Sequence, residues 1–338
     1  MLELMCGSWL AQALYVAAEL GIAGLLAAGP MPVTALSSGS GCADSDGLYR
    51  VLRLLASHGI FHEDDEQVFS LAPMGARLRS DVPGSMRDLV IFYGAESYQA
   101  WGGLLHGVRI GESPFRAVFD DDLFGYLRAR PERGSVFNGA MAASAPFFEH
   151  LAAAYEFPKG ALVVDVGGGS GAMLAAILVA RSDLRGMVVD QAEVIDDARR
   201  RMGSPGLTDR CAFEPGDFFK HVPAGGDVYV LSRILHDCDD DRCVDILANC
   251  RSAMTPDSRL LIVERLLPAA NTRSLACEFD LQMMVVSPSG RERDVPTYTR
   301  LLNRAGLSLV SVISLVFDVS VLECGRDPSA TPNTQTSH

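Results

Sequence analysis

The stretch Leu162-Val-Val-Asp-Val-Gly-Gly-Gly-Ser-Gly171 decides the fold of this 338-residue chain. An apolar run enters a glycine-rich turn, and a second apolar run from Ala172 to Ala180 follows, which predicts a strand, a tight turn and a helix. Glycines let the backbone approach a ligand closely, and the first turn of a helix presents free N–H groups. The sequence therefore predicts a nucleotide-binding loop at the carboxyl end of a strand.

The chain beyond Pro158-Lys-Gly160 repeats this alternation of strands and helices, which is typical of a mostly parallel α/β sheet. Two closely spaced runs near the end predict an antiparallel hairpin that closes the sheet. We expect residues 158–326 to form this domain and residues 327–338, rich in Pro, Ser, Thr and Asn, to form a flexible tail. The predicted strands are 162–166, 186–190, 211–214, 228–231, 260–264, 307–315 and 317–323.

Acidic residues at the predicted strand ends indicate a cationic cofactor. The spacing Gly167-x-Gly169-x-x-Ala172 also fits the relaxed dinucleotide fingerprint, which leaves an NAD oxidoreductase as an alternative. The Asp165 carboxylate, however, would repel a pyrophosphate and attract the sulfonium and ammonium of S-adenosylmethionine. Asp190 ends the next strand, where it could hold ribose hydroxyls, and Gly216-Asp217-Phe218 follows the third strand, where it could bracket an adenine. Together these positions favour S-adenosylmethionine over NAD.

The N-terminal part, residues 1–88, predicts a winged-helix pattern. Two short apolar helices (10–18 and 22–28) and an amphipathic helix (45–58) precede a predicted hairpin of 60–62 and 68–71. The pattern raises the alternative of a transcriptional regulator, but the wing carries four consecutive acids at 63–66, where a DNA reader needs Lys and Arg. We expect a homodimerisation domain, followed by a helical connector (89–157) that contributes to the substrate pocket.

Composition narrows the possible partners. The chain holds 29 Lys and Arg against 42 Asp and Glu, a net charge of −13, which disfavours nucleic acid and anionic membranes and suits neutral or cationic small molecules. The eight cysteines are scattered without a paired motif, which favours a reducing cytoplasm. No signal peptide and no membrane-spanning run is expected, because glycines and charges interrupt the longest apolar stretches.

Three further segments carry the chemistry. Leu231-Ser-Arg-Ile-Leu-His-Asp-Cys-Asp-Asp-Asp241 follows the fourth strand, Glu264 ends the fifth, and Gly290-Arg-Glu-Arg293 comes later. With these segments and the glycine loop, essentially the whole chain resembles the winged-helix class of S-adenosylmethionine-dependent small-molecule O-methyltransferases. That family includes plant caffeate-type and isoflavone enzymes and bacterial enzymes that tailor polyketides, phenazines and mitomycin-like compounds.

The resemblance implies a role for individual residues. The family's catalytic base falls on His236, its partner carboxylate on Glu264 and a second flanking carboxylate on Glu292. Implied substrate contacts fall on Trp101, Phe137, Met141, Asp237 and Met283. Implied contacts with S-adenosylmethionine fall on Asp165, Gly167, Gly169, Asp190, Gln191, Gly216, Asp217, Phe218, Ser232 and Arg233. The chain departs from the family at Cys238, usually Trp, and at Ser232, often Lys, which weakens the transfer of a substrate from any one relative.

The chemistry of these residue types agrees with such roles. A phenol titrates near pH 10, so it is mostly protonated at neutral pH, and an imidazole can accept its proton as the oxygen attacks a methyl carbon. A carboxylate on the other ring nitrogen orients the imidazole and stabilises its charged form. A metal held by His236 and the acids at 237, 239 and 240 is disfavoured, because consecutive acids at a helix start cannot all face one ion.

The sequence therefore predicts O-methylation of an aromatic secondary metabolite, expected to be polycyclic and phenazine-, polyketide- or quinone-like, with S-adenosylhomocysteine as second product. Alternatives are an N-methyltransferase or a relative that has drifted to another reaction with the same cofactor.

Overall fold

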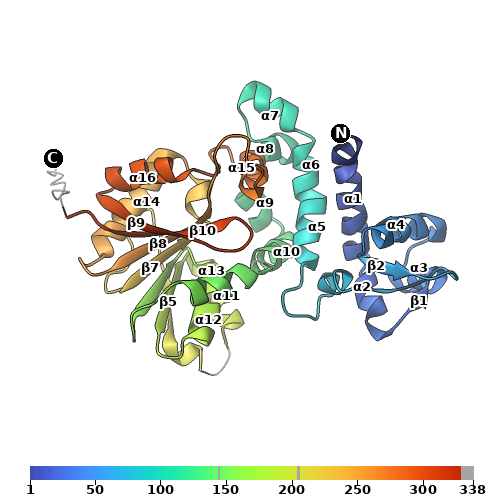
Figure 1. Cartoon of the computed structure of the whole chain (residues 1–338), viewed down its shortest axis with the longest axis horizontal. Helices are drawn as coiled ribbons and strands as arrows, with labels where there is room; N and C mark the ends of the chain where they lie inside the picture. Colours follow the sequence, from blue (N-terminus) through green and yellow to red (C-terminus); the bar gives the residue numbers. More distant parts are fainter. Residues whose placement is uncertain (144, 204–205, 329–338) are drawn as a thin grey trace. The chain divides into compact units, whose positions relative to one another are not determined.

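The computed structural model of the chain describes residues 1–143, 145–203 and 206–328 (Figure 1). These residues fall into two compact units, the first within residues 1–144 and the second within residues 145–338, which are described separately. The division into four parts at residues 88, 157 and 326 remains a prediction. The unit boundary precedes helix α11 (Ala145–Ala154), which packs on helix α12 (Ala172–Ala180) of the second unit.

The second unit is built on a seven-stranded sheet with the order β6-β5-β4-β7-β8-β10-β9. The first five strands in that order are parallel, and β10 pairs antiparallel with both β8 and β9. The predicted parallel sheet and its closing hairpin are therefore confirmed. The strands are β4 (Leu162–Val166), β5 (Arg185–Asp190), β6 (Cys211–Pro215), β7 (Val228–Ser232), β8 (Arg259–Arg265), β9 (Leu307–Ser314) and β10 (Val319–Arg326).

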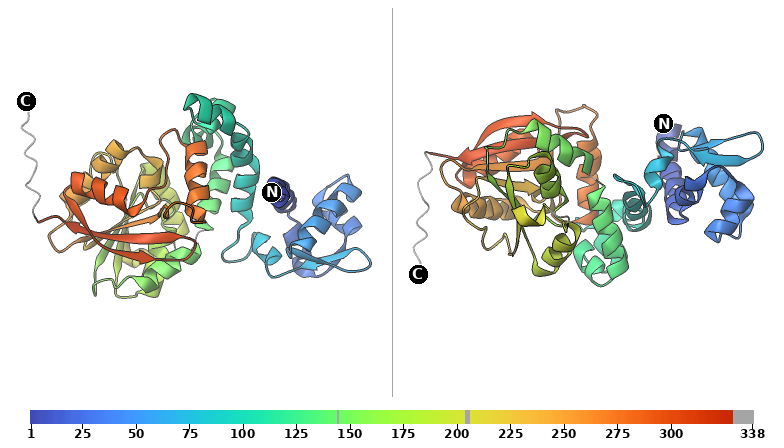
Figure 2. Two further views of the ribbon diagram at one scale, coloured as in Figure 1. Left: turned by 45° about the horizontal axis from the view of Figure 1, so that its top comes forward. Right: turned by 90° about the horizontal axis from the view of Figure 1, so that it is seen from below.

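Helices cover both faces of this sheet (Figure 2). Because successive strand side chains point to opposite faces, Val163 of β4 joins one hydrophobic core and Val164 joins the other. The first core is completed by α11, α12 and α13, and the second by α14 and α16. The remaining helices are α13 (Ala192–Arg201), η4 (Thr208–Arg210), η5 (Leu235–Asp237), α14 (Asp240–Ala253), α15 (Leu275–Val286) and α16 (Val295–Arg304).

Side-chain caps fix the helices that follow the chemically interesting segments. The Asp239 carboxylate accepts the backbone N–H of Arg242 at 2.9 Å and starts α14, and Asp294 accepts that of Thr297 at 2.9 Å and starts α16. Such caps satisfy N–H groups that have no partner within the helix. They also fix the chain direction of the two loops that enter these helices.

The first unit contains the predicted winged-helix pattern. Its core is formed by helices α1 (Leu2–Glu19), α2 (Ile22–Leu25), α3 (Val33–Ser40) and α4 (Ser45–Ser57), with the hairpin of β2 (Phe61–Glu63) and β3 (Val68–Leu71). A two-residue strand, β1 (Met31–Pro32), also pairs with β3. The remaining elements are η1 (Leu26–Ala28), η2 (Gly75–Leu78), α5 (Arg87–Phe92), η3 (Tyr93–Ser97), α6 (Tyr98–Trp101), α7 (Leu104–Ile110), α8 (Pro114–Phe119), α9 (Leu123–Arg128) and α10 (Pro131–Ala142).

Several boundaries differ from the sequence-based expectation. Helix α1 begins eight residues before Leu10. The prediction missed its first turns because their apolar side chains are exposed and do not continue the periodicity of the buried face. Phe317 was expected in the last strand but lies in the turn before it, because Phe317 and Asp318 both have positive φ angles (59° and 58°). Most of the tail predicted to be flexible, from residue 329 onward, lies outside the described residues.

Within the described part of the chain, no single helix is long and apolar enough to cross a membrane. The segments Leu2–Glu19 and Ile22–Ala28, bent by 52° relative to each other, have sufficient length and apolar character only when taken together.

Candidate active site

The carboxyl ends of the parallel strands bring the predicted site residues of the second unit to one edge of the sheet. β4 leads into the glycine loop, β5 ends at Asp190, β7 leads into the η5 turn, and β8 carries Glu264. The later segment 290–293 joins this edge through two backbone hydrogen bonds. Arg291 donates its N–H to the His236 carbonyl at 2.8 Å, and Leu267 donates its N–H to the Arg293 carbonyl at 3.0 Å.

The glycine loop adopts a backbone that side chains would disturb. Gly167 and Gly169 have φ angles of 72° and 56°, in the left-handed region that favours glycine. A Cβ added at Gly167 would lie 2.6 Å from the Ile234 side chain and 3.2 Å from the Phe218 ring, so glycine keeps this approach open. A loop with this shape, followed by the start of α12, suits a ligand that lies directly against the backbone.

Asp165 is the buried acid of this loop. Its side chain is 1% exposed, and its Oδ2 atom has no hydrogen-bond partner among the described residues. Burial raises the pKa of Asp165 to about 7, the Asp190 charge adds to the rise, and Arg233 opposes it. A nearby cation stabilises the charged form of such a buried carboxylate, and S-adenosylmethionine carries cations in its amino group and its sulfonium.

Asp190 closes the loop from the neighbouring strand. One carboxylate oxygen accepts the backbone N–H of Gly169 at 2.9 Å, and the other accepts that of Gln191 at 2.7 Å. Burial raises the pKa of Asp190, and these two hydrogen bonds oppose the rise. Gln191 itself is exposed and precedes α13 as its N-cap.

The third strand end places Gly216, Asp217 and Phe218 at the same edge. Gly216 donates its N–H to the Asp190 carbonyl at 2.8 Å, which ties the two loops together. Asp217 is exposed, and its ion pair with Lys220 at 3.0 Å lowers its pKa. The half-buried Phe218 ring, which reaches the glycine loop, offers an apolar surface suited to a flat base.

Ser232 and Arg233 lie where β7 leaves the sheet. The Ser232 hydroxyl is buried without a hydrogen-bond partner among the described residues. Arg233 has a positive φ of 56°, and its guanidinium lies 5.5 Å from the Phe147 ring centroid, within reach of a cation–π contact. Asp165, Gly167, Gly169, Asp190, Gly216, Phe218, Ser232 and Arg233 thus share one edge of the sheet, whereas Gln191 and Asp217 are exposed beside it.

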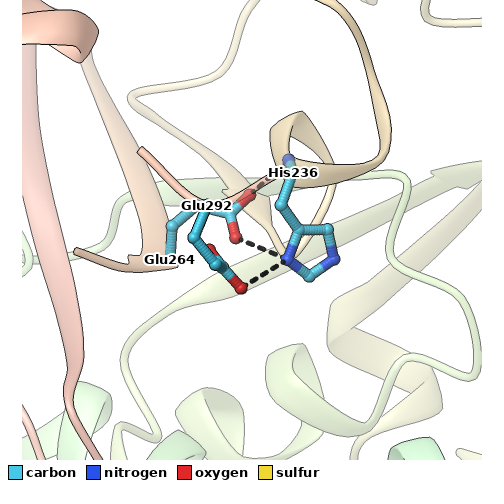
Figure 3. Close-up of side chains that lie close together, drawn as sticks. All are labelled: His236, Glu264 and Glu292. Carbon is cyan, nitrogen blue, oxygen red and sulfur yellow. Dashed lines mark hydrogen bonds and ion pairs between the residues drawn. The ribbon is translucent and has the colours of Figure 1, made fainter. Parts of the chain in front are cut away.

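His236 is the imidazole of the η5 turn, and two glutamates point at one of its nitrogens (Figure 3). His236 Nδ1 lies 3.2 Å from Glu264 Oε2 and 3.4 Å from Glu292 Oε1. All three residues are buried, with 8%, 0% and 2% of their surfaces exposed. Nδ1 is therefore directed to carboxylates, and Nε2 is the nitrogen left to receive a proton.

The other oxygen of Glu264 holds the turn itself. Glu264 Oε1 accepts the backbone N–H groups of Ile234 at 3.1 Å, Leu235 at 3.0 Å and His236 at 3.3 Å. Burial lowers the pKa of His236, but the Glu264 and Asp237 charges and the two glutamate contacts outweigh it, so the pKa stands well above its usual value. Burial raises the pKa of Glu292, and contact with His236 opposes this rise.

The remaining predicted substrate residues are divided between the two units. Asp237 Oδ1 lies 3.9 Å from His236 Nε2, and Met283 lies half-buried on α15. Phe137 and Met141 lie on α10 of the first unit, where the Phe137 ring packs 5.2 Å from the Phe92 ring. Trp101 ends α6 in the same unit. All five substrate assignments remain predictions.

One residue that sequence reasoning did not single out contacts the His236 turn. Arg293 is 2% exposed, and its guanidinium donates to the carbonyls of Leu235 and Cys238 at 2.8 and 2.6 Å. Arginine is mostly exposed in proteins, so residue type alone did not predict this burial. The only available signal was its position directly after Glu292.

Comparison with known proteins identifies the family of this chain. Residues 101–308 match the family described as O-methyltransferase domain, and residues 2–81 match the O-methyltransferase dimerisation domain. The chain belongs to the O-methyltransferase family. This membership confirms the predicted class I methyltransferase fold with an N-terminal dimerisation domain.

Individual O-methyltransferases are similar over nearly the whole chain. The 3-amino-4-hydroxybenzoate 4-O-methyltransferase of Streptomyces cremeus is 42% identical over 95% of this chain and 88% of that protein. The crystal structure of LaPhzM is 41% identical, with a TM-score of 0.90 over 96% of this chain and 98% of that one. The O-methyltransferase NcsB1 from neocarzinostatin biosynthesis, solved with S-adenosylmethionine and 2-hydroxy-5-methyl naphthoic acid, is 31% identical, with a TM-score of 0.78 over 94% and 95%.

These findings also bear on the cofactor and on the alternatives. S-adenosylmethionine is the cofactor of this family, as bound structures of similar enzymes show. A phenazine-1-carboxylate N-methyltransferase of Pseudomonas aeruginosa is 32% identical over 96% of this chain and 96% of that protein. The family thus includes enzymes that methylate nitrogen.

Proposed function

We propose that this enzyme transfers a methyl group from S-adenosylmethionine to a hydroxyl of an aromatic, polycyclic secondary metabolite, with His236 as the general base. The observation that carries the proposal is the buried imidazole whose Nδ1 faces two carboxylates. A histidine held in this way has one defined nitrogen, Nε2, that can accept a proton when the ring is neutral.

The residues at the sheet edge fit S-adenosylmethionine. The side chain of Asp165, with its unpartnered buried oxygen, would bind the cationic part, and Asp190 would hold the ribose. The positive-φ glycines would let the backbone of the loop approach the cofactor, and Phe218 would cover the adenine together with Gly216 and Asp217. Gln191, Ser232 and Arg233 complete the proposed set of cofactor contacts. When bound, the cofactor supplies an electrophilic methyl group on a sulfonium.

The protein's own contribution to the reaction is proton transfer and alignment. His236 Nε2 would take the proton that the hydroxyl loses when its oxygen receives the methyl group from sulfur and S-adenosylhomocysteine is released, and the imidazole would become positively charged. Glu264 and Glu292 stabilise that charge on the Nδ1 side and keep the ring in one orientation. A base of this type contributes roughly 10²–10⁴ in rate, and alignment of the reacting atoms contributes the rest.

The proposal extends to the substrate pocket and the partners. Trp101, Phe137, Met141, Asp237 and Met283 would contact the aromatic substrate, and thioether and aromatic side chains suit such a ring. The enzyme would act as a homodimer through residues 1–88, in keeping with the matched dimerisation domain. We further place it in the cytoplasm, without a nucleic-acid or membrane partner, as the acidic composition and scattered cysteines suggest.

A turnover assay by mass spectrometry tests this function. Wild type and His236→Asn are incubated with S-adenosylmethionine and hydroxylated aromatics, including catechols, hydroxyphenazines and hydroxyquinones, and S-adenosylhomocysteine binding is measured for both. The proposal predicts one added methyl, lost in the variant although binding persists. Methylation of nitrogen would instead persist in the variant, because a ring nitrogen lone pair needs no base, and this result would favour the N-methyltransferase alternative.

A further inference from the structure

The turn that carries His236 is bound from two sides. On one side, the Glu264 carboxylate accepts three backbone N–H groups of the turn. On the other side, Arg293 donates to two backbone carbonyls of the turn. Its Nη1 donates to the Leu235 carbonyl at 2.8 Å and its Nη2 to the Cys238 carbonyl at 2.6 Å. These two carbonyls bracket His236 and Asp237 in the chain, so one guanidinium spans the whole turn.

The guanidinium is deeply buried and binds three acceptors. Arg293 is 2% exposed, and its third contact, from Nε to Asp240 Oδ1 at 2.9 Å, supplies a countercharge from the first turn of α14. A buried charge is tolerated only when it is paired and hydrogen-bonded, and the planar fork of arginine fixes the direction of each bond. The arrangement is therefore rigid in a way that a flexible lysine ammonium would not reproduce.

The same short segment also supplies one of the carboxylates at the base. Glu292, directly before Arg293, places Oε1 at 3.4 Å from His236 Nδ1, and Arg291 donates its N–H to the His236 carbonyl. Moving this segment relative to the turn would move the carboxylate and the imidazole apart. The guanidinium thus couples the position of the base to the position of its acid partner.

We propose that Arg293 is a positioning residue of the methyl transfer, which locks the His236 turn onto the 290–293 segment so that Nδ1 meets Glu292 and Glu264 together. The inference rests on the proposed role of His236 as the base. Arg293 acts on the backbone on either side of His236. The ionisable groups that face the imidazole are Glu264 from β8, Glu292 from the 290–293 segment and Asp237 from the turn.

The experiment compares Arg293→Lys and Asp240→Asn with a matched control, Arg210→Lys. Arg210 likewise donates to backbone carbonyls, those of Leu178 at 2.9 Å and Leu184 at 3.0 Å, but it binds the end of α12 rather than the His236 turn. Asp240 is 44% exposed, so its substitution weakens the guanidinium contact without emptying a buried site. Each protein is labelled with ¹³C-histidine and titrated by NMR, with His236→Asn used to assign the His236 signal.

We expect Arg293→Lys to shift the His236 titration toward the ordinary histidine range and to lower kcat roughly 10–100-fold, with S-adenosylhomocysteine affinity unchanged. Asp240→Asn should shift the His236 titration and lower kcat in the same direction, but by smaller amounts. Arg210→Lys should lower the melting temperature and leave the His236 titration and kcat as in wild type.

The opposite pattern would overturn the proposal. If Arg293→Lys and Asp240→Asn lower only the melting temperature, as the control does, Arg293 merely stabilises the fold. The NMR titration needs no turnover, so it decides the role of Arg293 even if wild type methylates none of the compounds offered. In that case the proposed function fails while the positioning of His236 still stands or falls by its own measurement.

Discussion

The side chain of Glu264 binds His236 twice, through the imidazole and through the backbone. Its Oε2 atom lies 3.2 Å from His236 Nδ1, and its Oε1 atom accepts the backbone N–H of the same residue at 3.3 Å. One carboxylate at the end of β8 therefore fixes both the ring and the turn that carries it. This double contact explains how a short η5 turn after a sheet strand can hold a base in one orientation.

Replacement of the base tests its role in turnover. His236→Asn should lower kcat roughly 10²–10⁴-fold, because no other group would take the hydroxyl proton, and it should leave S-adenosylhomocysteine affinity unchanged. Steady-state kinetics and calorimetric titration measure the two quantities. His62→Asn, at an exposed histidine of β2, serves as the control and should behave as wild type. A His236→Asn enzyme with full kcat would contradict the assignment.

The pH dependence of turnover follows from the raised pKa of His236. The base must be neutral to accept a proton, so kcat/KM should rise with pH and level off only above the ordinary histidine pKa of 6.5. The protonated form is favoured in the folded state, so the stability it contributes is fully present below 6.5 and is lost as pH rises through the folded pKa. The melting temperature of wild type relative to His236→Asn should fall over that upper range. A rate plateau already reached below 6.5 would contradict this prediction.

The two glutamates should differ in their contribution to stability. Glu264→Gln removes the charge that accepts three backbone N–H groups, and we expect it to lower the melting temperature by several degrees and kcat roughly 10–100-fold. Glu292 is buried with a raised pKa, so Glu292→Gln should lower kcat while leaving the melting temperature unchanged or higher. Both variants should shift the pH–rate profile to lower pH, since each removes a negative charge beside the imidazole. Equal losses of stability in the two variants would show that the three N–H contacts have no special weight.

Replacement of Asp165 should stabilise the ligand-free enzyme and weaken its binding of S-adenosylhomocysteine. Its pKa of about 7, against an ordinary 3.8, means that folding is penalised increasingly as pH rises from 3.8 to 7. Asp165→Asn should therefore raise the melting temperature of the ligand-free enzyme at about pH 8 and weaken S-adenosylhomocysteine binding roughly 10-fold or more. Asp196→Asn on the surface of α13 is the matched control and should change neither quantity. An unchanged affinity in Asp165→Asn would remove this residue from the cofactor site.

The sequence predicted the sheet and its ligand edge because both follow from local patterns. Apolar runs such as Leu162–Val166 fit a strand buried on both faces, and the glycines after it require positive φ, so the strand, the loop and the helix could be placed from the residues alone. His236, Glu264 and Glu292 were placed from the resemblance to a family and not from spacing. The structure brings the three together, with a carboxylate oxygen of Glu264 and one of Glu292 within 3.4 Å of His236 Nδ1.

Features that depend on distant contacts could not be predicted. The burial of Arg293 requires that the 290–293 segment meet the η5 turn, more than 50 residues earlier in the chain. The positive φ of Phe317, which delays the start of β10, arises in a bulky residue where no local rule predicts it. The substrate residues Trp101, Phe137 and Met141 lie in a different unit from the base, and their predicted role rests on the resemblance alone.

The most direct test uses S-adenosylmethionine labelled with ¹³C in its methyl group and identifies the labelled atom in the product by NMR. With a hydroxylated polycyclic aromatic as acceptor, we expect a single labelled methyl on oxygen for wild type and its loss in His236→Asn. A labelled methyl on nitrogen, formed equally well by His236→Asn, would contradict both the reaction and the base.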